Sequence, residues 1–84
     1  MKYTLVYTHM AVKDIHKLEP TIKKRIGKTL LHYKEEPLRY AKKLTDPKFG
    51  TYRFRIGDYR VIFDIEDDEI VVLRVGHRKF IYKI

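Results

Sequence analysis

Three arginines in the last third of the chain are spaced so that they could bind one phosphate group together. Arg53 and Arg55 precede a Gly57-Asp58 pair, and Arg60 follows it. A Gly-X pair suits a two-residue type II′ hairpin turn, because glycine accepts a positive φ at the first central position. Such a turn places Arg55 directly opposite Arg60, with Arg53 on the same face of the hairpin.

This placement of like charges costs the fold stability and favours binding of an anion. Like charges in a cross-strand pair are destabilising, by up to about 1 kcal/mol. Guanidinium groups bind phosphate through two parallel hydrogen bonds, which explains both the residue type and the clustering. We therefore predict an anion-binding face. The alternative is a solvated face on which the arginine stems lie along the sheet.

The opposite face of the same hairpin is apolar, which supports the predicted register. Side chains alternate between the two faces of a strand, so one face receives only aromatic and aliphatic residues. The predicted cross-strand pairs on this face are Ile56 with Tyr59, Phe54 with Val61, and Tyr52 with Phe63.

A second group of candidate residues follows the next strand. The apolar run 70–75 ends at Gly76, after which come His77, Arg78 and, four residues later, Tyr82. We expect His77 and Arg78 to lean over the arginine face. Histidine, with a reference pKa near 6.5, is suited to acid-base chemistry, whereas arginine keeps its proton. The alternative for His77 is a surface histidine at a strand end.

The remaining pattern predicts the elements that hold these residues. Residues 2–7 alternate as a first strand. Ala11, Ile15 and Leu18 have helical spacing, and a second helix begins near Pro20 and ends by Glu36. Residues 37–50 are basic and loop-like, with room for one helical turn. The order is β-α-α-β-β-β, an α+β fold with an antiparallel sheet packed against an N-terminal helical hairpin.

The register of the last strand stays open at this stage. A two-residue turn at Asp67-Asp68 would place Arg74 on the apolar face of the sheet, where a charge is unfavourable.

Composition limits the classes of function. The 84 residues suit one domain over 1–84, and 19 Lys and Arg against 11 Asp and Glu give a net charge of +8. This charge favours nucleic acid or an acidic protein as partner. The chain lacks cysteine, which suits a cytoplasmic protein, and lacks a run of about 20 apolar residues, so we expect no membrane span.

Metal and cofactor sites are not indicated. The other histidines, His9, His16 and His32, are scattered and lack paired acids, and no glycine-rich phosphate loop precedes a helix. We expect no metal and no cofactor. The second helix carries Lys23, Lys24, Arg25 and Lys28. They could make non-specific contacts to phosphates, but a solvated helix face is the simpler interpretation.

Two segments together resemble the RelE/ParE superfamily of toxins from toxin-antitoxin systems, on the RelE side. They are Gly-x-Tyr-Arg-x-Arg-x-Gly-Asp-Tyr-Arg-Val-Ile-Phe at 50–63 and Val-Gly-His-Arg-x-x-x-Tyr at 75–82. With the order of elements, the resemblance covers essentially the whole chain.

The resemblance implies an endoribonuclease that cuts messenger RNA in the ribosomal A site. In such enzymes the 2′-hydroxyl attacks the adjacent phosphate, and positive groups stabilise the transition state. It assigns this role to Arg53, Arg55, Arg60 and Arg78, and contact with the messenger RNA to Tyr82. It also implies an acidic, RelB-like antitoxin as partner, besides the ribosome and messenger RNA. ParE-like members poison DNA gyrase instead, and a non-catalytic module that binds RNA or ribosomes is a further alternative.

The chain departs from the RelE pattern at two points. RelE toxins carry lysines where this chain has Arg53 and Arg55, and arginine does not exchange a proton, so His77 becomes the candidate acid or base. The spacing from Arg78 to Tyr82 varies in the family, so Tyr82 could either stack on a base or pack on the sheet.

Overall fold

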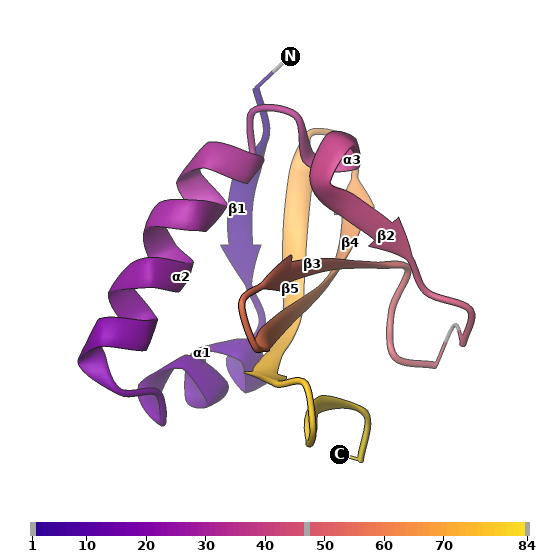
Figure 1. Ribbon diagram of the computed structural model, residues 1–84. Coiled ribbons are helices and arrows are strands. Elements are labelled where there is room, and N and C mark those ends of the chain that lie inside the picture. The colour runs from indigo at the N-terminus through magenta and orange to yellow at the C-terminus, as the bar shows by residue number, and fades with distance from the viewer. Residues whose placement is uncertain (1, 47, 84) are drawn as a thin grey trace.

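A five-stranded mixed sheet with helices on one face forms the body of the protein (Figure 1). The computed structural model describes residues 2–46 and 48–83. The strand order across the sheet is β1-β5-β4-β3-β2. In chain order the elements are β1 (Thr4–Tyr7), α1 (His9–His16), α2 (Pro20–Tyr33), α3 (Pro37–Tyr40), β2 (Ala41–Lys43), β3 (Tyr52–Ile56), β4 (Tyr59–Glu66), β5 (Glu69–His77) and a 3₁₀ turn (Ile81–Lys83).

The α+β fold is confirmed, with differences in the region 37–43 and at one edge of the sheet. The segment 37–50, for which the sequence allowed one helical turn, contains α3 and also the unpredicted short strand β2, which pairs antiparallel with β3. Three residues are too few to show an alternating pattern of apolar and polar side chains, so the sequence does not predict β2. β1 pairs with β5 in parallel, whereas the prediction was an antiparallel sheet.

Local sequence explains where the helices begin. Thr8 caps α1: its hydroxyl oxygen accepts a hydrogen bond from the Ala11 N–H at 3.1 Å and donates one to the Leu73 carbonyl at 3.0 Å. α2 begins at Pro20, whose fixed φ suits the first helical position. None of the helices in the described residues is long and apolar enough to cross a membrane.

The main core lies between α2 and the sheet. Ile26 and Leu30 of α2 face the predicted apolar side of the hairpin, where the rings of Phe54 and Phe63 stack with centroids 4.2 Å apart. The predicted pairs of the β3–β4 hairpin are all present, including Arg55 opposite Arg60. The period-two pattern and the Gly57-Asp58 turn therefore position the arginines as expected.

A bulge settles the register of β5. Asp67 and Asp68 form the two-residue turn, with Glu66 opposite Glu69, but the pairing shifts between Ile62 and Phe63. The extra residue moves Arg74 opposite Ile62, off the face that carries Phe63. The bulge thus removes the conflict that the sequence alone presented.

Arg74 instead ties α1 to β5. Its Nε and Nη2 donate to the two carboxylate oxygens of Asp14 at 2.7 and 3.0 Å, and the Val75 N–H donates to the same carboxylate at 3.0 Å. This pair is bidentate and mostly buried, so it holds the helix in one orientation.

A second, smaller apolar cluster covers part of the arginine face. Ile62 and Ile81 are each 1% exposed but lie outside the main core. Gly50, with φ 139°, lies so close to β4 and β5 that a Cβ there would be 2.7 Å from Ile62 and 2.9 Å from Leu73. Ile81 packs against Gly76, the residue opposite Arg60. The β2–β3 loop and the C-terminal turn therefore frame the arginines.

Candidate anion-binding active site

Arg60 lies at the centre of the candidate site and is nearly buried. Its side chain comes from β4, and the residue is 8% exposed. Nη1 donates hydrogen bonds to the carbonyls of Gly57 and Tyr59, both at 3.0 Å, so the turn itself fixes the guanidinium. Within the described residues no carboxylate forms an ion pair with Arg60. A buried cation without a counter-ion is a site that an anion would stabilise.

The surroundings of Arg60 disfavour its positive charge. Burial lowers its pKa from the usual value, and the neighbouring charges of Arg53, Arg55 and Arg78 lower it further, with Tyr82 acting in the opposite direction. Four arginines therefore act on one another electrostatically. A cluster of guanidinium groups suits the binding of an oxyanion such as a phosphate group.

Arg78 approaches the site from the end of β5. Its backbone N–H donates to the Asp58 carbonyl at 2.7 Å, and its Nε lies 3.4 Å from an Asp58 carboxylate oxygen. Both side chains are more than half exposed, so this ion pair contributes little to stability. The backbone bond nevertheless anchors Arg78 beside the hairpin turn, near Arg60.

Tyr82 stands at the rim of the same face. It belongs to the C-terminal 3₁₀ turn, and its ring meets Phe49 of the β2–β3 loop edge-on, with centroids 5.5 Å apart. Tyr82 remains partly exposed, at 39%. The structure therefore brings it near Arg60 and leaves part of its ring open to solvent.

His77 lies on the other side of the sheet from Arg60. It pairs with Tyr59 and meets that ring edge-on at 5.4 Å, while Gly76 is the residue opposite Arg60. Its Nδ1 accepts a hydrogen bond from the Lys79 N–H at 3.1 Å, which leaves Nε2 as the nitrogen that can exchange a proton with a ligand. The four arginines and Tyr82 thus gather together, whereas His77, which we expected to lean over the arginine face, lies on the opposite face of the sheet.

Two further basic residues lie beside the hairpin: Lys42, which sequence reasoning did not select, and Arg25, which it considered only among the basic residues of the second helix. Lys42 pairs with Arg53 across β2 and β3, so it shares the arginine face. The Arg25 guanidinium, from α2, lies against Gly57: a Cβ on that glycine would be 2.8 Å from Nη1. No local signal marks either residue, because both contacts depend on how β2 and α2 pack against the hairpin.

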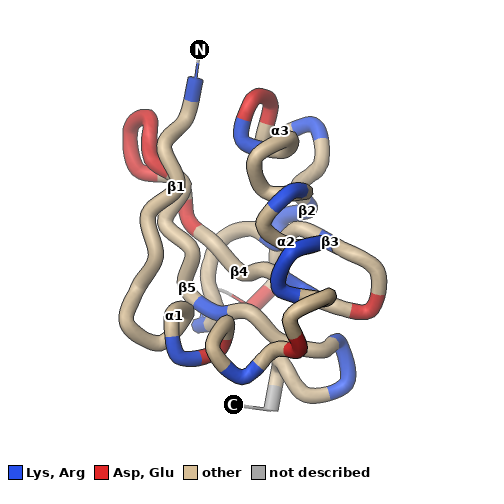
Figure 2. The backbone as a smooth tube through the Cα atoms, turned by 90° about the vertical axis from the view of Figure 1, so that its left-hand side faces the viewer, with Lys and Arg blue, Asp and Glu red and all other residues tan. Residues whose placement is uncertain are grey.

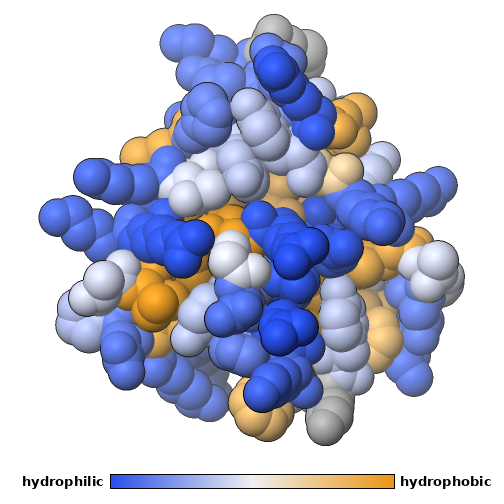
Figure 3. Space-filling model, viewed as in Figure 1, coloured by the Kyte–Doolittle hydropathy of each residue, from blue (hydrophilic) through white to orange (hydrophobic). Residues whose placement is uncertain are grey.

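The charges are unevenly arranged over the molecule. Acidic residues gather in the β4–β5 turn beside β1, at the far end of β4 from Arg60, and basic residues occur on many elements (Figure 2). On the face seen in Figure 3, hydrophilic side chains predominate, with apolar ones exposed between them. Among the described residues, no group of His, Asp or Glu could hold a metal ion.

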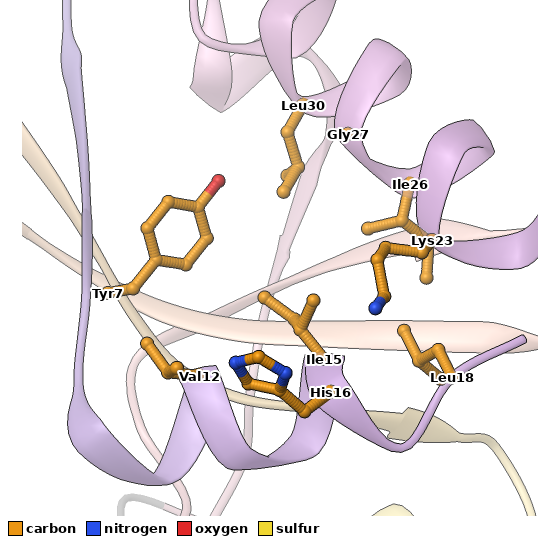
Figure 4. A pocket seen from close by; sticks show the side chains of 9 residues that line it. All are labelled: Tyr7, Val12, Ile15, His16, Leu18, Lys23, Ile26, Gly27 and Leu30. Carbon is orange, nitrogen blue, oxygen red and sulfur yellow. The ribbon is translucent and has the colours of Figure 1, made fainter. Parts of the chain in front are cut away.

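A separate apolar cavity lies between the helices and β1. It has a volume of about 310 Å³, and the side chains of Tyr7, Ile15 and Leu30 come from β1, α1 and α2 to line it (Figure 4). Burial raises the pKa of the Tyr7 hydroxyl. Its lining is mainly aliphatic, so this cavity lacks the cation cluster that distinguishes the arginine face.

Fold and site together define a small basic α+β protein whose outer sheet face carries a cluster of arginines. The family model for the ParE toxin of type II toxin-antitoxin systems matches residues 5–82. The chain belongs to this family, within the RelE/ParE toxin superfamily, and it is a toxin of a type II toxin-antitoxin system.

Similar proteins support the RelE side of the superfamily. Toxin RelG of Mycobacterium tuberculosis is 38% identical over 99% of both chains. The mRNA interferase toxin RelE of Escherichia coli is 30% identical, over 94% of this chain and 86% of the relative. The crystal structure of the toxin-antitoxin complex RelBE2 from Mycobacterium tuberculosis superimposes with a TM-score of 0.84 at 37% identity, covering 93% of this chain and 100% of the other.

Proposed function

We propose that this toxin is a ribosome-dependent endoribonuclease that cleaves messenger RNA in the A site and so stops translation. One observation carries the proposal: the buried Arg60 guanidinium, fixed by two carbonyls, has no carboxylate ion partner in the described residues and is surrounded by other arginines. A phosphodiester supplies the missing negative charge. The name mRNA interferase, which the Escherichia coli relative carries, adds support.

The arginines act on the charge that develops during the reaction. The ribose 2′-oxygen attacks the adjacent phosphorus, the bond to the 5′-oxygen breaks, and a 2′,3′-cyclic phosphate and a 5′-hydroxyl result. Negative charge grows on the non-bridging oxygens in the transition state. Arg60 is already desolvated and hydrogen-bonded, so it stabilises this charge without reorganising. Arg53, Arg55 and Arg78 orient the phosphate and add to the positive field, and Tyr82 contacts the messenger RNA.

The reaction also requires that one proton leaves the 2′-hydroxyl and another reaches the 5′-oxygen. The arginines keep their protons near neutral pH, so they serve as electrostatic clamps. We assign the proton transfer to His77, which would act from the edge of the sheet, because its ring lies on the Tyr59 side of β5. His77→Gln should lower the single-turnover cleavage rate about 10²-fold or more, with ribosome affinity unchanged. An undiminished rate in this variant would exclude His77 and leave proton transfer to water or ribosomal RNA.

An acidic antitoxin is the proposed partner in the cell. The similar structure from Mycobacterium tuberculosis was solved as a complex with an antitoxin, and the net charge of +8 favours an acidic protein. Ribosomes and messenger RNA are the proposed targets, which places the activity in the cytoplasm.

The deciding experiment is cell-free translation with purified toxin. New 5′ ends on the messenger RNA are mapped by primer extension, with and without ribosomes. We expect cuts within the A-site codon only when ribosomes are present, and no cuts with Arg60→Met, which removes the central charge. Intact messenger RNA with the wild-type toxin would exclude this function.

DNA gyrase poisoning is the second candidate, because the matched family model is that of the ParE toxin. This function needs binding without cleavage. Supercoiling by purified gyrase, assayed with the toxin, separates the two: gyrase inhibition with intact messenger RNA supports the ParE-like function. Ribosome binding with neither effect supports a non-catalytic module.

A further inference from the structure

A second cavity adjoins the arginine face and has the composition of a base-binding pocket. It has a volume of about 310 Å³ and lies between the β2–β3 loop and the C-terminal turn, segments that flank the same side of the molecule in Figure 1. Its lining residues are Leu44, Thr45, Asp46, Phe49 and Tyr82. It therefore combines two aromatic rings with two polar side chains.

The loop that forms this cavity is attached to the sheet at several points. The Leu44 N–H donates to the Thr51 carbonyl at 2.9 Å, and the Thr51 N–H donates to the Asp64 carboxylate at 2.7 Å. The close approach of Gly50 to Ile62 holds the loop against β4. The pocket walls are thus positioned by β4, the strand that also carries Arg60.

The pocket and the arginine cluster share Tyr82. This residue lines the cavity, and it directly follows Ile81, which packs against Gly76, the residue opposite Arg60. A nucleotide whose phosphate lies on Arg60 would therefore have its base within reach of the Tyr82 and Phe49 rings. Aromatic rings bind bases by stacking, which does not depend on the base.

Asp46 is the residue that could distinguish one base from another. An ionised carboxylate only accepts hydrogen bonds. Its Oδ1 accepts from the Lys48 N–H at 3.1 Å, which fixes the orientation of the side chain. Oδ1 keeps a second lone pair and Oδ2 has no partner among residues 2–46 and 48–83, so both oxygens can accept from a ligand. Guanine presents two adjacent N–H donors at its Watson–Crick edge, whereas uracil presents only one. A carboxylate therefore favours guanine.

We propose that the cavity between Asp46, Phe49 and Tyr82 binds a base of the RNA next to the scissile phosphate and that Asp46 selects guanine. The inference rests on the proposed ribonuclease function for its biological role. The binding itself depends only on the pocket and the arginines.

Titration of nucleoside monophosphates, followed by NMR, tests the pocket without requiring cleavage. Wild-type protein should bind guanosine monophosphate roughly tenfold or more tightly than uridine monophosphate, with shifts of the Tyr82 and Phe49 ring signals. Asp46→Asn keeps an oxygen that can accept from Lys48, so the turn is preserved. It should abolish the preference for guanine while the affinity for uridine monophosphate remains. Asp68→Asn, in the remote β4–β5 turn, is the matched control and should change neither value.

Equal affinities for the two nucleotides in the wild type, or a guanine preference that survives Asp46→Asn, would overturn the proposal. The same variants are then compared in ribosome-dependent cleavage, where wild-type toxin should cut preferentially next to guanine and Asp46→Asn should lose this preference. If the wild type cuts no messenger RNA, the proposed function fails, and the titration still decides whether the pocket selects guanine.

Discussion

At the scale of single residues, Arg60 is the clearest sign of function in the protein. Burial and three neighbouring arginines both oppose its charge, yet the hairpin holds it in place through the Gly57 and Tyr59 carbonyls. This arrangement lowers the stability of the fold. It also presents a positive charge that is already in position when the ligand binds.

Arg60→Met should separate anion binding from folding. Methionine fills a similar space without charge, so the fold should persist while the site loses its central cation. In wild-type protein, phosphate should raise the midpoint of thermal unfolding relative to chloride at equal ionic strength, since a ligand that binds only the native state stabilises it. The variant should lose this shift and about 10²–10³-fold in cleavage rate. A phosphate shift of the same size in the variant would show that the anion binds elsewhere.

At the scale of elements, a mostly buried ion pair between Asp14 and Arg74 joins α1 to β5. Burial by itself would raise the pKa of Asp14, but the hydrogen bonds from Arg74 and from the Val75 N–H outweigh it, so the pKa lies below the usual 3.8. The same bond raises the pKa of Arg74. The ionised carboxylate therefore stabilises the folded state.

Asp14→Asn should reduce the free energy of unfolding at pH 7 by about 1.5–3 kcal/mol, because a charged hydrogen-bond acceptor is lost and Arg74 is left unpaired. Asp14 has a lower pKa in the folded than in the unfolded state. Its contribution is therefore complete above about pH 4 and disappears as pH falls through the folded-state pKa. Urea unfolding at pH 7 and at low pH measures both effects. A difference from wild type that persists unchanged in acid would contradict this account.

Two glycine substitutions should have opposite effects in different elements. Gly50 has φ 139°, and a Cβ there would collide with Ile62 and Leu73, so Gly50→Ala should destabilise the protein by about 1–3 kcal/mol. Gly27 lies on α2 with no atom within 4 Å of an added Cβ, so Gly27→Ala should stabilise by about 0.5–1 kcal/mol. Thermal unfolding of both variants provides the comparison, and equal shifts would be inconsistent with the backbone geometry.

At the scale of the whole molecule, the net charge of +8 raises the question of which cations contact the target. Arg53 and Arg55 lie on the candidate site, whereas Lys24 and Lys28 lie on α2. Binding to phosphates releases counter-ions, so each contact adds to the dependence of affinity on salt.

Neutralising two charges on the arginine face should therefore change ribosome binding and its salt dependence, whereas neutralising two charges on α2 should not. The double variant Arg53→Gln with Arg55→Gln should weaken ribosome binding and lower the slope of log K against log salt by about 1–2. Lys24→Gln with Lys28→Gln removes the same charge and should leave the slope unchanged. Fluorescence titrations with ribosomes at several salt concentrations measure both. Equal losses would mean that α2 also contacts ribosomal RNA.

The sequence alone determined the hairpin and the side of the sheet on which its arginines lie. The Gly57-Asp58 turn and the period-two alternation are local signals, and both predicted that Arg55 stands opposite Arg60. α2 begins at Pro20, near its predicted start, for the same reason, since proline acts on the residues next to it. The family resemblance also rested on short-range patterns within 50–63 and 75–82.

Only the tertiary structure decided how distant segments meet. The bulge in β5 moves Arg74 toward Asp14, sixty residues away in the chain, and it also determines that Gly76 stands opposite Arg60 and His77 opposite Tyr59. Ile81 of the C-terminal turn packs against Gly76, opposite Arg60, and the pocket at Asp46 requires Phe49 and Tyr82 to meet. These features depend on contacts between segments that are far apart in the sequence. Such contacts form only after the sheet has formed, so no local or periodic pattern in the sequence predicts them.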